Sequence, residues 1–291
     1  MKVRIGIGAA AMTPASLPDI VAGIDDLGFD SLWLSEVLTG PVPDPVVGLT
    51  WAAASNPRVK IGTTMLLPGR NVLRLAKQLA TLDVLSQGRL LITMVPGLTH
   101  APERDAIGVE PKRRGAIIDE ALPLLRRLWA GESVTHEGAV GNFRDVKISP
   151  LPVQQPLEMW LGGTAPAALE RCGRLSDGWL PSLCTPDEAA AGRVVIEAAA
   201  AKAGRSISPE HFGMSIGYAT KPLDEATARR LNARNPRAAE LTPVGLPALR
   251  ERLERFIAVG FSKFVVRPIA TPPSWRAELE ALATAVGDLQ T

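Results

Sequence analysis

The stretch AKQLATLDVLSQGRLLITMVPG, residues 76–97, joins a helix pattern to a strand pattern through one turn. Leu75, Leu79 and Leu82 recur at helical spacing and place an apolar stripe on one face. Gly88 ends the helical pattern, and residues 90–95 then form a mostly apolar run of strand length. A helix that leads directly into a buried strand is the repeating unit of parallel α/β folds, so this stretch predicts that fold class.

The same alternation continues along the chain. Runs of strand character occur at residues 3–8, 31–35, 59–67, 90–95, 157–161, 179–183, 212–219 and 263–268. Helical patterns separate nearly all of them, and this count predicts a (β/α)8 TIM barrel, whose usual length is about 250 residues. We therefore expect a single domain over residues 1–291, with an insertion at 131–156 and a candidate lid at 221–243.

Three helix starts carry capping patterns. Ser16 with Asp19, and Thr185 with Glu188, fit the capping box, in which an N-cap hydroxyl and an acid three residues later each accept a backbone N–H bond. Asp44 precedes a proline and predicts an N-cap ahead of a first-turn proline.

Composition excludes several classes of protein. The chain has 291 residues, 46% of them hydrophobic, and a net charge of +2, which gives no strong field for nucleic acid or a membrane surface. No apolar run reaches the length of a membrane span. The two cysteines, Cys172 and Cys184, have no metal-ligand spacing and favour a reducing compartment. We expect a cytoplasmic protein without a metal, whose first residues form a strand and not a targeting segment.

The segment GIGAAA, residues 6–11, matches the glycine fingerprint of dinucleotide-binding folds and follows a strand. Glu36 closes the second strand, where a ribose-binding acid would stand. The fingerprint requires a helix to begin at its glycines. Pro14, Pro18 and the cap at Ser16 delay the helix, so we favour the barrel over a Rossmann fold.

Gly162, Gly163 and Thr164 follow an apolar strand and precede a helix at Pro166. Backbone N–H groups, a hydroxyl and a helix N-terminus would then point at one place, which is the geometry of an anion site. A tight strand-to-helix turn needs the same glycines for its dihedral angles alone. The spacing by itself does not separate these two interpretations.

Titratable side chains follow several strands at the carboxyl end, where barrel enzymes keep their active sites. His100 follows the fourth strand and is either a general acid or base or a solvated loop residue. Glu36 is a catalytic candidate or a surface carboxylate, and Arg267 meets either an anionic group or a neighbouring carboxylate. We expect His136 and His211 to be surface or packing residues.

A basic run also opens one of the helices. Lys112, Arg113 and Arg114 stand together at the start of the helical pattern that continues to residue 129. A run of like charges at a helix start is typical of a solvated face, and we expect all three side chains in solvent.

Four stretches together resemble the luciferase-like monooxygenase superfamily, in the branch that commonly uses the deazaflavin coenzyme F420. They are GFDSLWLSE (28–36), VKIGTTMLLPGRNVLRLAKQLATLDVLSQGRLLI (59–92), EGAVGNFRDVKISPLPVQQPLEMWLGGTAPAALERCGRLSDGWLPS (137–182) and GFSKFVVRP (260–268). The combination of ATLDVLSQGR with WLGG and DGW is specific, whereas neither half alone is. The resemblance implies a (β/α)8 barrel with insertions, in agreement with the strand count.

The resemblance also implies a cofactor site. Its residues are Glu36, Thr64, Met65, Pro96, Gly97, Gly162, Gly163 and Thr164. The ring would rest at the carboxyl mouth against a bulge at Thr64 and Met65, joined by a cis peptide bond, with Glu36 beside it. The phosphate would lie near the two glycines and Thr164.

The chain departs from the family pattern at this site. Val37 stands where relatives frequently carry histidine, and Thr93 and Val95 replace the usual glycines at the end of the fourth strand. Proton transfer, where the reaction needs it, then falls to Glu36, His100 or solvent.

The resemblance implies an oxidoreductase that transfers a hydride between F420 and a small organic substrate. Two alternatives stay open: an FMN-dependent monooxygenase that uses oxygen, and a barrel that binds a flavin-type ligand without turnover. We expect the protein to form a homodimer and to bind a small-molecule substrate. We expect it to bind neither nucleic acid nor a membrane.

Overall fold

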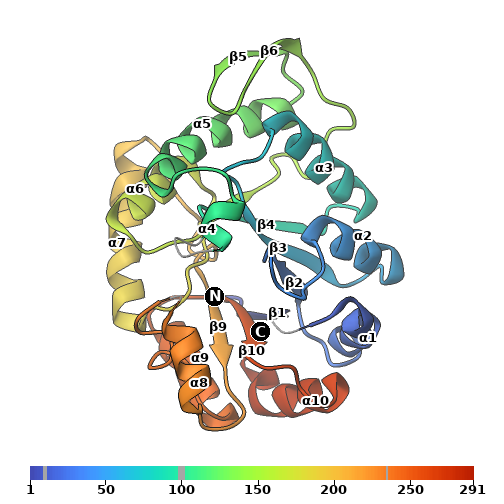
Figure 1. Ribbon diagram of the computed structural model, residues 1–291, viewed down its shortest axis with the longest axis vertical. Coiled ribbons are helices and arrows are strands. Elements are labelled where there is room, and N and C mark those ends of the chain that lie inside the picture. The colour runs from blue at the N-terminus through green and yellow to red at the C-terminus, as the bar shows by residue number, and fades with distance from the viewer. Residues whose placement is uncertain (9–11, 98–101, 234) are drawn as a thin grey trace.

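The computed structural model describes residues 1–8, 12–97, 102–233 and 235–291, and its main sheet consists of parallel strands surrounded by helices (Figure 1). The strands of this sheet are β1 (Arg4–Gly8), β2 (Ser31–Ser35), β3 (Lys60–Leu66), β4 (Leu90–Val95), β7 (Met159–Leu161), β8 (Gly178–Trp179), β9 (Gly213–Tyr218) and β10 (Lys263–Pro268). The helices are α1 (Leu17–Asp26), α2 (Pro45–Ser55), α3 (Val72–Leu85), α4 (Glu103–Ala106), α5 (Pro111–Trp129), α6 (Pro166–Leu175), α7 (Pro186–Lys202), α8 (Glu225–Asn232), α9 (Leu246–Ala258) and α10 (Trp275–Val286). Two 3-10 turns complete them, η1 (Pro14–Ser16) and η2 (Gly287–Leu289).

The eight strands form a barrel. Their order is β8-β7-β4-β3-β2-β1-β10-β9, and every pair is parallel. Parallel bridges from Trp179 to Phe212 and from Ser182 to Ser215 join the two ends of this order. The predicted (β/α)8 barrel is therefore confirmed, and all eight predicted strands are present.

The sheet separates two apolar regions. Outward side chains of the strands pack with the helices in one large core. Inside the barrel, Trp33, Leu180 and Val265 form a smaller cluster, against which Leu91 and Trp160 pack. The alternation of side chains along each strand produces this division, because successive residues face opposite sides.

Gly6 belongs to the interior and not to a dinucleotide site. A Cβ atom built on Gly6 would lie 2.9 Å from Cδ1 of Trp33, and one built on Gly62 would lie 2.4 Å from its Cδ2. Both glycines are needed because the Trp33 ring fills the space inside the barrel between β1 and β3.

Two of the three capping predictions are confirmed. Asp44 Oδ1 accepts the Val47 N–H at 3.1 Å, and Thr185 and Glu188 form a complete capping box. The prediction at Ser16 is wrong, because η1 already gives this residue helical dihedral angles and its hydroxyl lies 3.2 Å from that of Thr13.

The segment at 131–156 contains the antiparallel hairpin of β5 (Val134–Gly138) and β6 (Gly141–Val146), which stands out beyond α5 in Figure 1. The candidate lid at 221–243 contains α8. Its role as a lid stays a prediction.

Candidate active site

The carboxyl ends of the strands meet at one mouth of the barrel, and several of the inward side chains there are small. Gly8, Gly162 and Gly217 occupy three of these positions, and Ser35 and Thr64 two more. A Cβ on Gly162 would lie 2.8 Å from Cγ1 of Val95, so the inward direction of this position is filled by a neighbour. The floor of the mouth is therefore closely packed at this position.

The loop of Gly162, Gly163 and Thr164 connects β7 to α6 at this mouth. Gly163 has φ +100°, which side chains rarely adopt, and its carbonyl accepts the Trp179 Nε1–H at 2.9 Å. The N-cap residue of α6, Ala165, makes no side-chain cap bond, and Thr164 is exposed. An uncapped helix end beside an exposed hydroxyl is chemically suited to an anion such as a phosphate.

A cavity of about 430 Å³ begins at Thr164 and runs along the start of α7. Its walls include Trp179, Leu183, Glu188 and Arg237. Arg237 forms an ion pair with Glu188 at 2.6 Å, which connects the candidate lid to the first turn of α7. The space beside the loop of Gly162, Gly163 and Thr164 is thus bounded by the ion pair of Arg237 with Glu188. This pair was not identified from the sequence.

Glu36 lies at the mouth with both carboxylate oxygens engaged. Oε2 accepts the Leu66 N–H at 2.8 Å, and Oε1 pairs with Arg70, whose Nε–H donates to the Leu66 carbonyl at 2.8 Å. The Glu36 side chain is only 8% exposed. This arrangement fixes the loop after β3, and the partner Arg70 was missed because only the folded chain brings the two loops together.

The expected strain at Thr64 and Met65 is absent. The two cis peptide bonds among the described residues both precede proline, so the Thr64–Met65 bond is trans. The pairing of β3 continues without a register shift, with β2 as far as Thr64 and with β4 as far as Leu66, so there is no bulge. The regular pairing with β4 explains the difference, because it keeps the backbone of β3 extended through Met65. Thr64 faces the mouth, whereas the Met65 side chain is buried in the outer core.

Pro96 and Gly97 follow β4 at the mouth, and a buried arginine holds this region. Arg114 is 2% exposed and donates to the carbonyls of Pro96 and Arg104. Gly97 has φ +84°, and a Cβ built on it would lie 2.5 Å from Cδ1 of Ile107. The prediction that Arg114 is solvated is wrong, because its guanidinium packs against the carbonyls of Pro96 and Arg104 and is buried there. His100 lies outside the described residues.

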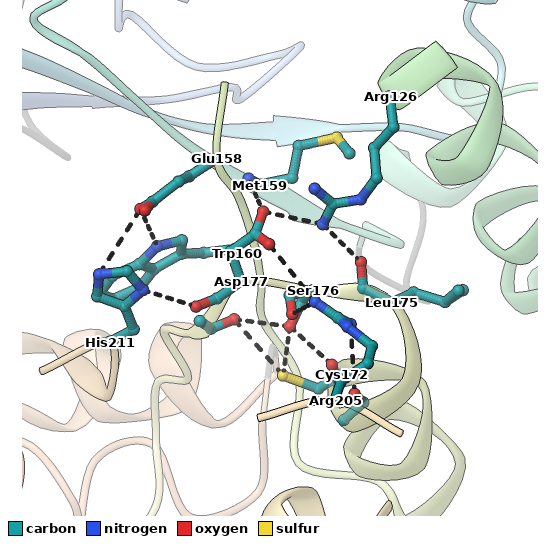
Figure 2. A network of polar contacts seen from close by, with 12 residues as sticks. Arg126, Glu158, Met159, Trp160, Cys172, Leu175, Ser176, Asp177, Arg205 and His211 are labelled. Atoms are coloured by element: carbon teal, nitrogen blue, oxygen red, sulfur yellow. Dashed lines mark hydrogen bonds and ion pairs between the residues drawn. The ribbon is translucent and has the colours of Figure 1, made fainter. Parts of the chain in front are cut away.

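The other two histidines are packing residues, as predicted. His136 Nε2 lies 2.7 Å from Glu120, and His211 Nδ1 lies 2.8 Å from the Asp177 carbonyl. Figure 2 shows His211 beside the Trp160 ring, with ring centroids 5.3 Å apart.

Figure 2 also shows Asp177 at the centre of a polar network near the amino ends of the strands. Its carboxylate accepts the Met159 N–H and a bond from Arg126, both at 2.8 Å, and lies 3.5 Å from Arg205. Each of these groups contacts the Asp177 carboxylate, and they lie at the end of the barrel opposite the mouth. A cavity of about 120 Å³ at that end is lined by Trp33, Lys60, Trp160 and Lys263 among others.

Comparison with known proteins gives a family. A family model described as luciferase-like monooxygenase matches residues 1–263. None of the helices built from the described residues has the length and apolarity of a membrane span.

Two named relatives match different shares of the chain. An F420-dependent glucose-6-phosphate dehydrogenase from Kineococcus radiotolerans is 31% identical over 191 residues, which cover 62% of this chain and 56% of that protein. One from Microbacterium testaceum is 26% identical and covers 91% of both chains. The match to the first relative thus spans little more than half its length.

A solved structure agrees over the whole chain. An F420-dependent secondary alcohol dehydrogenase in complex with an F420-acetone adduct superposes with a TM-score of 0.84 at 18% identity and covers 100% of each chain. At this identity the likeness shows the fold.

Proposed function

We propose, from the premise that this chain belongs to the luciferase-like monooxygenase family, that it is an oxidoreductase that binds coenzyme F420 at the carboxyl mouth of its barrel. It would transfer a hydride between this cofactor and a small organic substrate. The observation that carries the proposal is the glycine loop before α6, which is open, uncapped and beside an exposed hydroxyl. The relatives that use F420 support the choice of cofactor.

The residues present fit such a cofactor. The Gly162 N–H already donates to the Met94 carbonyl at 3.2 Å, so the phosphate would be held by the half-buried Gly163, by the exposed hydroxyl of Thr164 and by the uncapped start of α6. Thr64 faces the mouth from β3 and would contact the ring, while the Glu36–Arg70 pair keeps the adjoining loop in place. When bound, coenzyme F420 supplies the ring carbon that accepts or donates the hydride.

The protein's own contribution is positioning and exclusion of water. The floor of the mouth is closed by the packing of Val95 against Gly162 and by the buried side chain of Thr93. A substrate above this floor would meet the ring in a fixed orientation, which supplies much of the rate in reactions whose chemistry belongs to a cofactor.

Proton transfer is assigned to His100 from its sequence position. Both Glu36 oxygens already accept bonds, which makes this carboxylate a poor proton shuttle. We expect His100→Ala to lower turnover by ~10²-fold and to leave F420 affinity unchanged. Wild-type turnover in this variant would remove His100 from the mechanism.

Titration of the purified protein with F420 and with FMN, followed by cofactor fluorescence, tests the proposed function. We expect tighter binding of F420. Micromolar affinity for FMN without detectable F420 binding would instead support the flavin-dependent monooxygenase, and binding of neither would support a barrel without this chemistry.

A further inference from the structure

The cavity of about 120 Å³ at the amino end of the barrel is lined by two indole rings. Trp33 and Trp160 both belong to the apolar cluster inside the barrel. Glycine makes room for each ring, because a Cβ on Gly62 would lie 2.4 Å from Cδ2 of Trp33 and one on Gly178 would lie 2.4 Å from Cε2 of Trp160. The cavity thus has an apolar inner wall, and its volume corresponds to about four water molecules.

Charged side chains also line this cavity, and the two signs of charge belong to different strands. Arg4, Lys60 and Lys263 are the first residues of β1, β3 and β10. Since β10, β1, β2 and β3 are consecutive in the sheet, these cations gather on one side of the cavity. Glu158 and Glu210 instead precede β7 and β9, which flank β8 where the barrel closes. The cavity therefore has a cationic side and an acidic side.

The cationic side has more positive charge than its own acid neutralises. Asp30 pairs with both Lys60 and Lys263, so one carboxylate serves two ammonium groups. Lys60 is half-buried and uses one of its three N–H donors in its 3.0 Å contact with Asp30. Arg4 adds a guanidinium whose ion pair with Glu210 is 3.7 Å long. These groups leave hydrogen-bond donors and one positive charge for a carboxylate.

The acidic side has acceptors that need a donor. His211 Nδ1 lies 2.8 Å from the Asp177 carbonyl, which only accepts, so this nitrogen carries a proton. A neutral imidazole bonded in this way has a lone pair at Nε2, and Glu158 Oε2 lies 3.8 Å from it, beyond hydrogen-bond distance. The Trp160 Nε1–H reaches the same oxygen at 3.5 Å, as Figure 2 shows. Among the described residues Glu158 has no closer polar partner, so its carboxylate is open to a cationic donor.

We propose that this cavity binds a small zwitterion, in which a short hydrocarbon chain joins an ammonium group to a carboxylate. The ammonium would bond Glu158 and His211 beside the Trp160 ring, whose face also attracts a cation. The carboxylate would meet Lys60 and Arg4, and the chain would lie against the indoles. A simple anion would be repelled by Glu158, and a simple cation by the lysines. The site lies at the end opposite the mouth, so this inference does not depend on the proposed function.

Isothermal titration calorimetry of the purified protein with glycine, β-alanine and 4-aminobutanoate tests this inference. The three compounds differ in the length between their charges, and we expect at least one to bind saturably with a Kd of about 1 mM or below. Propionate and propylammonium each keep one charge and should bind at least ~10-fold more weakly, because each leaves one side of the cavity unmatched. Saturation by none of the zwitterions would mean that the cavity holds water alone, and equal affinity for a singly charged compound would mean a simple ion site. Either result would overturn the inference.

Two variants locate the binding at this cavity. Glu158→Gln removes the acid that would hold the ammonium and should weaken the preferred zwitterion by about 10- to 100-fold. Lys60→Met should weaken it by roughly 10-fold from the carboxylate side. Glu197→Gln is the matched control and should bind like the wild type, because Glu197 is 47% exposed against 43% for Glu158 and belongs to α7 outside the barrel. Glu158→Gln should keep the wild-type melting temperature, since its long contacts stabilise little. Wild-type affinity in Glu158→Gln would contradict the proposed site.

Discussion

The amino end and the carboxyl mouth of the barrel differ in the residues that line them and in the roles that these residues have. The amino end is crowded with charges that bond one another, among them the pairs of Asp30 with Lys60 and Lys263. The carboxyl mouth has glycines, hydroxyls and one inward arginine among its described positions. In barrel enzymes stability belongs to the first end and chemistry to the second. Substitutions at the two ends should therefore separate unfolding from cofactor binding.

The centre of the amino end is a buried ion pair. Lys263 is 7% exposed on its side chain, bonds Asp30, and donates to Ser31 Oγ at 3.1 Å. Burial raises the pKa of Asp30, but the two lysines outweigh it and hold that pKa at about 2. Burial lowers the pKa of Lys263 to about 8 despite its partner. Both groups are charged at neutral pH, and each depends on the other.

The largest expected effect is on stability at the amino end. Asp30→Asn leaves the Lys263 ammonium buried without its counter-ion and should lower the free energy of unfolding by about 3–5 kcal/mol. Adding Lys263→Met should restore much of this loss, because the unpaired charge is removed. Denaturant unfolding of the single and the double variant measures both changes in the free energy of unfolding. A single variant as stable as the wild type would show that the pair does not stabilise this end.

A second variant tests the network in Figure 2. Asp177→Asn removes the charge that Arg126 and Arg205 share and should cost about 1–3 kcal/mol. Glu251→Gln on the exposed face of α9 is the control and should change little. Cofactor affinity should stay constant in both, and a marked loss in Asp177→Asn would mean that the two ends are coupled.

The buried pair of Asp30 and Lys263 also makes the stability of the protein depend on pH. The pKa of Asp30 in the folded protein, about 2, lies below the ordinary value of 3.8, so its stabilisation is present above pH 4 and is lost as the pH falls toward 2. The loss should be roughly 2 kcal/mol. Acid unfolding followed by circular dichroism should show a shallower dependence in Asp30→Asn, and identical slopes would contradict this assignment.

The smallest effect is expected at the mouth. Glu36→Gln should keep a bond to the Leu66 N–H but lose the ion pair with Arg70, at a cost of about 1 kcal/mol. Arg70→Met should cost a similar amount, and the double variant less than their sum, because the two groups act together. Additive losses would mean that the two residues stabilise the loop independently.

The sequence predicted what depends on local pattern. Apolar spacing located the eight strands, and the caps at Asp44 and Thr185 need only neighbouring residues. The burial of Arg114 could not be predicted, because a basic run at a helix start looks solvated until a distant loop covers it. The partner of Glu36 is likewise set by tertiary contact. The strained bond at Thr64 came from the resemblance alone, and the regular register of β3 rejects it.

The measurement that tests the central claim most directly is the F420 affinity of Thr164→Asp compared with the wild type. This substitution puts a carboxylate beside the proposed phosphate position and should weaken binding at least ~10-fold by charge repulsion. Because Thr164 is exposed, the melting temperature should not change, and Thr164→Ser, which keeps the hydroxyl, should bind normally. Unchanged F420 affinity in Thr164→Asp would contradict the claim that the mouth of the barrel, at the loop before α6, holds the cofactor.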